Sequence, residues 1–241
     1  MNRLSALLVA LCAAGIALAS PFLLATFKAL PLSTSPAALL AAQAALVLVL
    51  CAISAYAGVR FAPRAGLDAP WLRAIAERRD GPPAFRSIAI ESAMIGSITA
   101  IVVTAVALMP RSALTESLLH PPGGFWVRAS AAFYGGIVEE TIARWGLLTA
   151  LVALSRRVGL RDAFWPENFA SALVFAGLHV PLIAAKGIPL TAAVVTQALA
   201  GNAIAGTVFG WVFRRRGLEA AMVAHGAADV WLRAALPVLL A

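Results

Sequence analysis

Long apolar stretches separated by short polar linkers run along the whole of this 241-residue chain. A helix needs about 20 mostly apolar residues to cross the hydrocarbon core of a bilayer. By that measure the sequence predicts seven spans, at about residues 4–27, 38–59, 88–109, 126–154, 167–185, 190–213 and 218–240. The predicted fold class is therefore all-α, a polytopic membrane helical bundle of about seven transmembrane helices.

The composition agrees with a membrane protein. Hydrophobic residues make up 61% of the chain and charged residues 12%, whereas soluble domains typically carry roughly 25% charged residues. The formal net charge of +8 could indicate nucleic-acid binding. However, the arginines lie in the linkers between apolar segments, where membrane topology and anionic lipid headgroups explain them better. We therefore expect the lipid bilayer, and no nucleic acid, as a partner.

The basic residues also predict an orientation. If the seven spans alternate, one side of the membrane receives most of them, namely Arg3, Arg60, Arg64, Arg73, Arg78, Arg79, Arg86, Arg156, Arg157, Arg161, Arg214, Arg215 and Arg216. The other side receives only Lys28, Arg111, Arg128 and Lys186. By the positive-inside rule the amino terminus is cytoplasmic. The alanine- and arginine-rich composition is typical of a high-GC bacterium, which predicts the bacterial cytoplasmic membrane as the location.

The linker at 60–87 is the longest polar stretch of the chain. We interpret it as a charged cytoplasmic loop near lipid headgroups, with a short interfacial helix around Trp71 to Arg79 as the less favoured alternative. We divide the chain, as one integral membrane domain, into residues 1–125, with the N-terminal transmembrane helices and this loop, and residues 126–241, a helical core.

The first apolar segment has a second interpretation. Arg3, an apolar run and Ala-Leu-Ala at 17–19 resemble a signal peptide with its cleavage site. The apolar run continues to Phe27, which is long for a signal peptide, so we favour an uncleaved span. Cleavage would leave the remaining topology unchanged.

Three charged residues interrupt the predicted span at 126–154, in the sequence Glu-Glu-Thr-Ile-Ala-Arg at 139–144. A charged side chain near the centre of a bilayer costs from about 2.5 to above 10 kcal/mol, so it needs a partner, water or a function. Glu140 and Arg144 lie four residues apart, so they can pair on one face of a helix. Glu139 points about 100° away from Glu140 on an α-helix and is left free to act as a general base. A buried ion-pair network that locks helices together is the alternative.

Two further spans each carry a histidine beside a residue four positions away. Phe175 and His179 share one face of the fifth span, and His225 and Asp229 share one face of the seventh. At about 1.5 Å rise per residue, Glu139 and His179 lie at comparable depths, while His225 lies nearer the arginine-rich side. We therefore expect an intramembrane catalytic cavity that opens toward the cytoplasm. His120 lies in an outer loop, and we assign it no function.

These three motifs, E-E-T-I-A-R, F-A-G-L-H and H-G-A-A-D, resemble the motifs of the CPBP family of intramembrane proteases. That family includes type II CAAX prenyl endopeptidases and bacterial proteins of bacteriocin processing and immunity. The resemblance covers about residues 126–235 and implies that 126–241 is a catalytic core. It implies that Glu139 and His179 activate the attacking water, and that His225 and Asp229 hold a metal or stabilise the oxyanion. It also implies structural support by Glu140 and Arg144. We expect Phe175, on the same helix face as His179, to give structural support as well.

The cofactor stays open at this stage. Glu139, His179, His225 and Asp229 could bind zinc with a water in the open position, as in other catalytic zinc centres. A metal-independent pair of Glu139 and His179 is the alternative. Asp229 stands where the prenyl endopeptidases commonly have asparagine, and an anion there favours a cation ligand over a pure oxyanion role. The motifs of site-2, rhomboid and aspartyl intramembrane proteases are absent from the sequence.

The sequence therefore predicts a membrane-embedded endopeptidase that hydrolyses a peptide bond of a membrane-associated peptide or protein. Two other classes compete with it. The first is a catalytically inactive membrane scaffold or immunity factor, and the second is a proton-coupled transporter, since membrane carboxylates and histidines also build proton relays. Against a transporter, the chain shows no paired halves with interrupted helices. In a bacterium we expect an unprenylated substrate.

Overall fold

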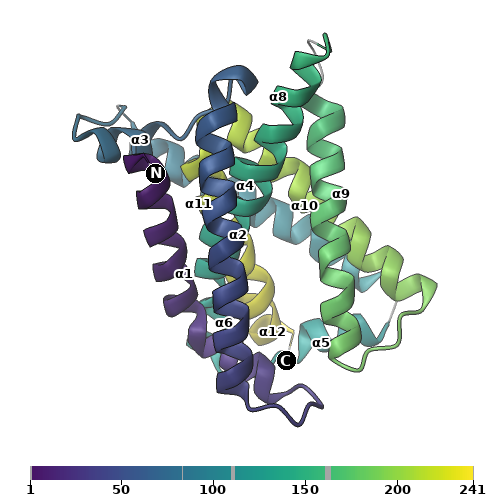
Figure 1. Ribbon diagram of the computed structural model, residues 1–241. Helices are drawn as coiled ribbons and strands as arrows, with labels where there is room; N and C mark the ends of the chain where they lie inside the picture. Colours follow the sequence, from purple (N-terminus) through teal and green to yellow (C-terminus); the bar gives the residue numbers. More distant parts are fainter. Residues whose placement is uncertain (1, 83, 110–111, 161–163, 241) are drawn as a thin grey trace.

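The computed structural model describes residues 2–82, 84–109, 112–160 and 164–240, and within these residues all regular secondary structure is helical, with short linkers between the helices. Within these described residues, five helices are long and apolar enough to cross a membrane (Figure 1). They are α1 (Arg3–Lys28), α2 (Pro36–Ala65), α4 (Phe85–Leu108), α9 (Phe164–Ala185) and α10 (Ala192–Arg216). Their bounds agree with five of the predicted spans to within about six residues. The all-α prediction is confirmed, and these helices indicate a multi-pass integral membrane protein.

The two other predicted spans are helical but divided into shorter pieces. The stretch at 125–157 consists of α6 (Phe125–Ala129), α7 (Ala131–Phe133), the π-helices η1 (Tyr134–Glu139) and η2 (Thr141–Leu148), and α8 (Thr149–Arg157). The stretch at 218–239 consists of α11 (Leu218–Asp229), the π-helix η3 (Val230–Ala235) and α12 (Leu236–Leu239). Both stretches were predicted as spans; they are helical, but π-turns interrupt the α-helix in each of them. Such turns occur frequently at functional sites.

Two short helices lie between the long ones, α3 (Pro70–Glu77) and α5 (Ala113–Leu119). Helix α3 lies in the linker at 60–87, so the less favoured prediction of a short helix there is the correct one. Its backbone is tied to the bundle because the Leu72 N–H donates to a carboxylate oxygen of Glu219 on α11 at 2.6 Å.

Local signals in the sequence set several helix ends. The side chain of Asn2 accepts a hydrogen bond from the Ser5 N–H at 2.8 Å and caps the start of α1. Ser35 caps α2, which begins with Pro36. Helix α2 ends at Ala65 and is capped by Gly66, whose φ of 62° is easily reached only without a side chain.

The main core joins the amino-terminal helices to the rest of the bundle. Trp145 on η2 is fully buried in this core, and its indole N–H donates to the Ala55 carbonyl of α2 at 3.3 Å. Gly58 makes room for that ring, because a Cβ at position 58 would lie 2.2 Å from the indole nitrogen. The close approach of α2 and η2 thus depends on a tryptophan and a glycine, and it fixes the position of the segment that carries Glu139 and Glu140.

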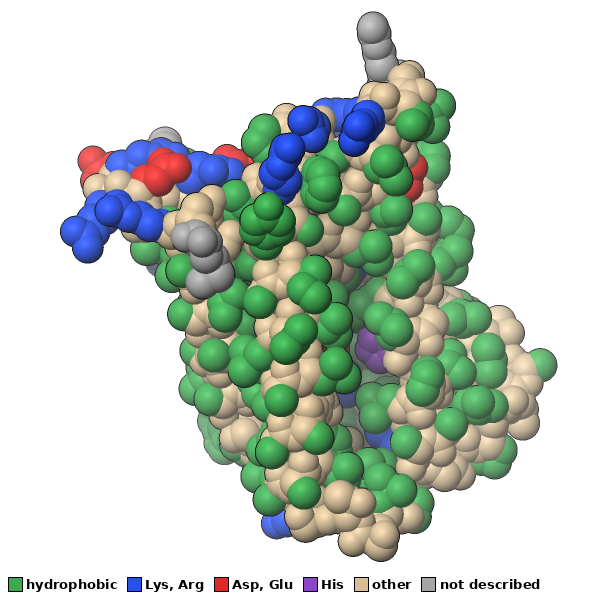
Figure 2. Space-filling view, viewed as in Figure 1, with side chains coloured by type: hydrophobic (Ala, Val, Ile, Leu, Met, Phe, Trp, Pro, Cys, Tyr) green, Lys and Arg blue, Asp and Glu red, His purple; other side chains and the backbone are tan. Residues whose placement is uncertain are grey.

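The surface is divided as a membrane protein requires. Figure 2 shows lysine and arginine side chains gathered at the end of the bundle near α3 and α8, above a broad hydrophobic belt. Large apolar side chains on α2 face outward in that belt; Leu46, Val49, Ile53 and Tyr56 are all more than half exposed. This inverts the arrangement of a soluble bundle. The predicted gathering of basic linkers at one end is therefore present, with Arg111 and Arg161 lying outside the described residues.

Candidate active site

Three elements bring the motif residues together in the middle of the bundle. Glu139 ends η1, and Glu140 links it to η2. His225 and Asp229 lie on α11, which packs against η1, and Phe175 and His179 lie on α9. The sequence predicted this convergence from motif order and depth; in the structure five of the six residues line one pocket, and Glu140 lies buried behind His225.

Glu140 is the buried anchor of the site. Its side chain is fully buried, and its Oε2 lies 3.3 Å from the Nε of Arg144, whose side chain is 1% exposed. The guanidinium of Arg144 also donates to the Gly206 carbonyl at 3.0 Å and lies 5.2 Å from the centre of the Phe175 ring. The pairing predicted from the spacing of four residues is present. Because the Oε2 of Glu140 and the Nη1 of Arg144 lack hydrogen-bond partners among the described residues, Coulombic attraction dominates this contact.

His225 is held on one face of its ring and at its Nδ1 edge. Its ring stacks on Phe209 with centroids 4.8 Å apart, and its Nδ1 lies 2.8 Å from the Oε1 of Glu140. An ionised carboxylate only accepts hydrogen bonds, so Nδ1 carries a proton and donates it. The other nitrogen, Nε2, lies 3.7 Å from the Oε2 of Glu139 and 3.9 Å from the Oδ2 of Asp229. Glu140 therefore orients the ring so that Nε2 faces two further carboxylates.

Asp229 has a cationic partner that the sequence analysis missed. The Nε of Arg233 on η3 donates to the Oδ1 of Asp229 at 2.8 Å. The two residues lie four positions apart with the acid first, the same arrangement as Glu140 and Arg144 and the favourable order on a helix. That repeated spacing is a signal in the sequence that could have identified Arg233.

Glu139 and His179 face the open part of the site. The Glu139 side chain is 21% exposed, whereas that of Glu140 is fully buried. On α9 the Nδ1 of His179 donates to the Phe175 carbonyl at 2.9 Å, since a carbonyl only accepts, and the Phe175 ring meets the imidazole edge to face at 4.7 Å. This bond leaves the Nε2 of His179 available to a ligand. Both residues line the pocket described next.

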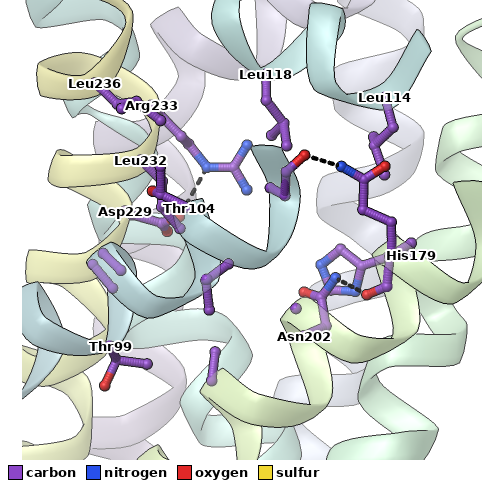
Figure 3. A pocket seen from close by; sticks show the side chains of 18 of the residues that line it. Thr99, Thr104, Leu114, Leu118, His179, Asn202, Asp229, Leu232, Arg233 and Leu236 are labelled. Atoms are coloured by element: carbon purple, nitrogen blue, oxygen red, sulfur yellow. Dashed lines mark hydrogen bonds and ion pairs between the residues drawn. The ribbon is translucent and has the colours of Figure 1, made fainter. Parts of the chain in front are cut away.

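The pocket has a volume of about 180 Å³ and a mostly apolar wall (Figure 3). Its charged or imidazole-bearing lining residues are Glu139, His179, Lys186, His225, Asp229 and Arg233. A second pocket, of about 300 Å³, lies between α1, α2 and α9 and shares Glu139, His179, Lys186, Asp229 and Arg233 with the first. Figure 2 shows histidine and basic side chains within a hollow of the hydrophobic face.

The position of the pocket corrects one expectation. Besides the site residues, it is lined by the carboxyl-terminal halves of α4 and α9, by α5 and by the amino-terminal half of α10. These parts lie at the end of the bundle opposite the arginine-rich linkers (Figure 1). The expected opening toward the arginine-rich side is therefore wrong. That expectation used only the distance of His225 from one end of its helix, whereas tertiary packing decides where the bundle stays open.

Gly135 is a second site residue that the sequence analysis missed. A Cβ at this position would lie 2.0 Å from the Oδ2 of Asp229 and 2.9 Å from the Nε2 of His225. Its neighbour Gly136 is equally constrained, because a Cβ there would lie 2.6 Å from the Met222 carbonyl. The Gly-Gly pair one turn before the two glutamates therefore lets α11 approach η1. Two adjacent glycines in a predicted membrane helix were the only signal for this.

A catalytic zinc site requires three protein ligands that converge on one point. Among residues 2–82, 84–109, 112–160 and 164–240, no three His, Cys, Asp or Glu side chains form a group suited to a metal ion. Asp229 is engaged by Arg233, and Glu140 is engaged by Arg144 and His225. To bind zinc, Asp229 would have to leave Arg233, and the four predicted ligands do not form a metal-binding group as they are arranged, so these residues do not fit a zinc ion.

Comparison with known proteins gives one result on this part of the chain. Residues 121–231 match the family model described as type II CAAX prenyl endopeptidase, Rce1-like. The match includes every motif residue named above. No curated protein and no solved structure matches the chain.

Proposed function

Because residues 121–231 form a domain of the Rce1-like type II CAAX prenyl endopeptidase (CPBP) family of membrane proteases, we propose that this protein is an intramembrane endopeptidase. Its substrate is a membrane-associated peptide or protein. One observation carries the proposal: two neighbouring glutamates meet the two nitrogens of one histidine. Glu140 holds Nδ1 at 2.8 Å from inside the core, while Glu139 lies 3.7 Å from Nε2 and lines the pocket.

In the proposed reaction Glu139 is the general base. It accepts a proton from a water molecule in the pocket, and the water oxygen attacks the carbonyl carbon of the scissile peptide bond. The Nε2 of His179 is free to accept a hydrogen bond from that water and to orient it. The resulting tetrahedral intermediate carries an oxyanion. Glu139 then gives its proton to the leaving amide nitrogen, and the bond between carbon and nitrogen breaks.

His225 stabilises the oxyanion in this scheme. With both ring nitrogens protonated, Nδ1–H remains bonded to Glu140 and Nε2–H points to the space beside Glu139 and Asp229. A donor fixed in advance toward developing charge is commonly the largest contribution of an active site to catalysis. Asp229, neutralised by Arg233, keeps the far side of that space polar without adding a full negative charge.

No step of this scheme passes through a metal, because Arg144 engages Glu140 and Arg233 engages Asp229. A zinc ion, if bound, would supply an activated water. The candidate ligands for it are those predicted from the sequence, Glu139, His179, His225 and Asp229. The contact between Asp229 and Arg233 favours the metal-independent alternative.

We further propose seven membrane crossings. Two of them are the helical stretches at 125–157 and 218–239, whose π-helical turns interrupt otherwise continuous helix. The amino terminus is then cytoplasmic and the membrane is the bacterial cytoplasmic membrane. In that orientation the pocket lies in the outer half of the bilayer.

The experiment compares membranes from cells that produce the wild-type protein, Glu139→Ala, or the control Glu91→Ala. Glu91 pairs with Arg216 outside the site, and both side chains are more than one third exposed. We expect carboxyl-terminal or amino-terminal fragments of at least one membrane protein with the wild type and with Glu91→Ala, and none with Glu139→Ala. Identical membrane proteomes in all three strains would instead favour an inactive scaffold.

A further inference from the structure

A hydrogen bond between α2 and η1 places two polar side chains in the pocket between α1, α2 and α9. The Nε2 of Gln43 donates to the hydroxyl oxygen of Tyr134 at 3.0 Å. Both residues line this pocket of about 300 Å³, together with Glu139 and His179. The proposed reaction uses neither Gln43 nor Tyr134. A polar amide in a span as apolar as α2 is costly in a bilayer, so its position beside the proposed base indicates a function.

Each member of this pair keeps one hydrogen-bonding group free. The Tyr134 hydroxyl accepts a hydrogen bond from Gln43, and within the described part of the chain no acceptor engages its O–H. In the same part of the chain no donor engages the Oε1 of Gln43. A phenol can donate and accept at once, and a carboxamide oxygen accepts. The pair therefore offers the pocket one donor and one acceptor, side by side.

Packing fixes the pair next to the proposed base. The side chain of Tyr134 packs against two apolar clusters built from α1, α2 and η1, one containing Val47 and the other Leu23. Tyr134 and Glu139 are the first and last residues of η1. In a π-helix residue i bonds to residue i+5, so these two residues lie one turn apart. The free O–H of Tyr134 and the carboxylate of Glu139 consequently address the same pocket.

We infer that Gln43 and Tyr134 form a binding site for one backbone residue of an extended substrate chain. The Oε1 of Gln43 accepts the N–H of that residue, and the O–H of Tyr134 donates to its C=O. The N–H and C=O of one extended residue point to the same side, as in an antiparallel strand pair where one residue exchanges both bonds with its partner. The inference rests on the proposed protease function, because it places the bound residue in the pocket that contains Glu139.

The membrane explains why such a site is needed. A peptide in hydrocarbon satisfies its backbone groups within a helix. A peptide bond has to leave that helix before water can attack its carbonyl carbon, and the released N–H and C=O groups are costly where no water replaces their bonds. Gln43 and Tyr134 replace two of these bonds. The site thus recognises the backbone and not a particular side chain, and it excludes proline at the bound residue, because proline has no N–H.

Binding tests this site without turnover. The probe is a fluorescently labelled decamer of alanine and leucine with an amidated carboxyl terminus. Its matched analogue is the decamer of lactic and leucic acid, in which ester oxygens replace the backbone N–H groups. Each is titrated into purified Glu139→Gln protein in a nonionic detergent. We expect the peptide to bind about tenfold more tightly than the ester, as when one buried acceptor is left without its donor.

Other outcomes of this titration contradict the inference. An equal or reversed preference would overturn it, because a site for a lipid ester group would bind the ester chain at least as well as the peptide. Failure of the peptide to bind would overturn it as well.

Variants in the Glu139→Gln background assign the preference to the named residues. Gln43→Met keeps the length of the side chain and should abolish the preference for the peptide. Tyr134→Phe removes only the hydroxyl and should weaken both chains about threefold to tenfold, because both carry carbonyl groups. The control is Tyr56→Phe, which removes the hydroxyl of the chain's other tyrosine, 65% exposed on α2, and should change neither affinity.

A purely structural role predicts a different pattern. Gln43→Met would then weaken both chains by the same factor and leave the ratio of their affinities unchanged, which would contradict the inference. Unchanged binding of both chains in Tyr134→Phe would contradict it too.

Cleavage separates this inference from the proposed function. If the wild type cleaves the peptide at a rate that Gln43→Met and Tyr134→Phe do not change, the backbone site is wrong and the protease stands. If the preference for the peptide depends on Gln43, but neither the peptide nor any membrane protein in the proteome comparison is cleaved, the backbone site stands and the protease is wrong.

Discussion

Glu140→Gln gives the sharpest test of how the site is held together. The substitution keeps the shape of the side chain and removes its charge, so it leaves Arg144 buried without a countercharge. At 3.3 Å and an effective dielectric constant of about 20, the lost attraction is about 5 kcal/mol. Breaking a buried ion pair typically costs about 3–5 kcal/mol. Arg144 keeps its bond to the Gly206 carbonyl and its contact with Phe175, so we expect the lower end, about 3 kcal/mol.

The assay is thermal unfolding of purified protein in one detergent. For a chain of this length, about 3 kcal/mol corresponds to a midpoint lowered by roughly 6–12 °C. Glu91→Gln is the matched control, because it breaks the exposed pair with Arg216 and should cost below about 1 kcal/mol. Adding Arg144→Met to Glu140→Gln removes the stranded cation and should recover most of the loss. A midpoint for Glu140→Gln within about 2 °C of the wild type, or a double variant no more stable than the single one, would refute this reasoning.

Three further predictions follow from the same geometry. Gly135→Ala should lower turnover about a hundredfold, because its Cβ would lie 2.9 Å from the Nε2 of His225 and displace that ring, while Gly177→Ala, whose Cβ would meet no atom within 4 Å, should leave turnover unchanged in the same peptide-cleavage assay. Asp229→Asn and treatment with a chelator should both leave most of the activity, and loss of activity in both, with recovery on adding zinc, would establish a zinc enzyme. Cysteines placed at Arg79 and Arg215 should react with a membrane-impermeant reagent only after the cells are opened, and labelling in intact cells would reverse the proposed orientation.

Much of the fold could be predicted because the bilayer imposes simple rules. Length and apolarity alone located α1, α2, α4, α9 and α10. Contacts between residues four positions apart could also be predicted, because the geometry of a helix alone brings such residues together. Glu140 with Arg144 and Phe175 with His179 are both present in the structure.

The features that the sequence did not reveal depend on contacts between distant segments. Glu139 approaches His225, which lies 86 positions further along the chain, and no periodicity predicts that pairing. Gly135 shows its importance only when α11 lies against η1. Arg233 is a different case. Its spacing of four residues from Asp229 is visible in the sequence, but Asp229 was interpreted as a metal or oxyanion residue and not as the partner of an arginine.

The π-turns explain how two neighbouring glutamates reach one imidazole. In an α-helix their side chains would diverge by about 100°. Hydrogen bonds from residue i to i+5 widen the turn in η1 and η2, so adjacent side chains diverge by a smaller angle. Glu140 then meets Nδ1 of His225 and Glu139 faces Nε2, one on each side of the ring. Arg144 neutralises Glu140 and Arg233 neutralises Asp229, so within the described chain Glu139 is the carboxylate of this group without an arginine partner. A base needs that freedom, because a carboxylate paired with an arginine gives up much of its affinity for a proton.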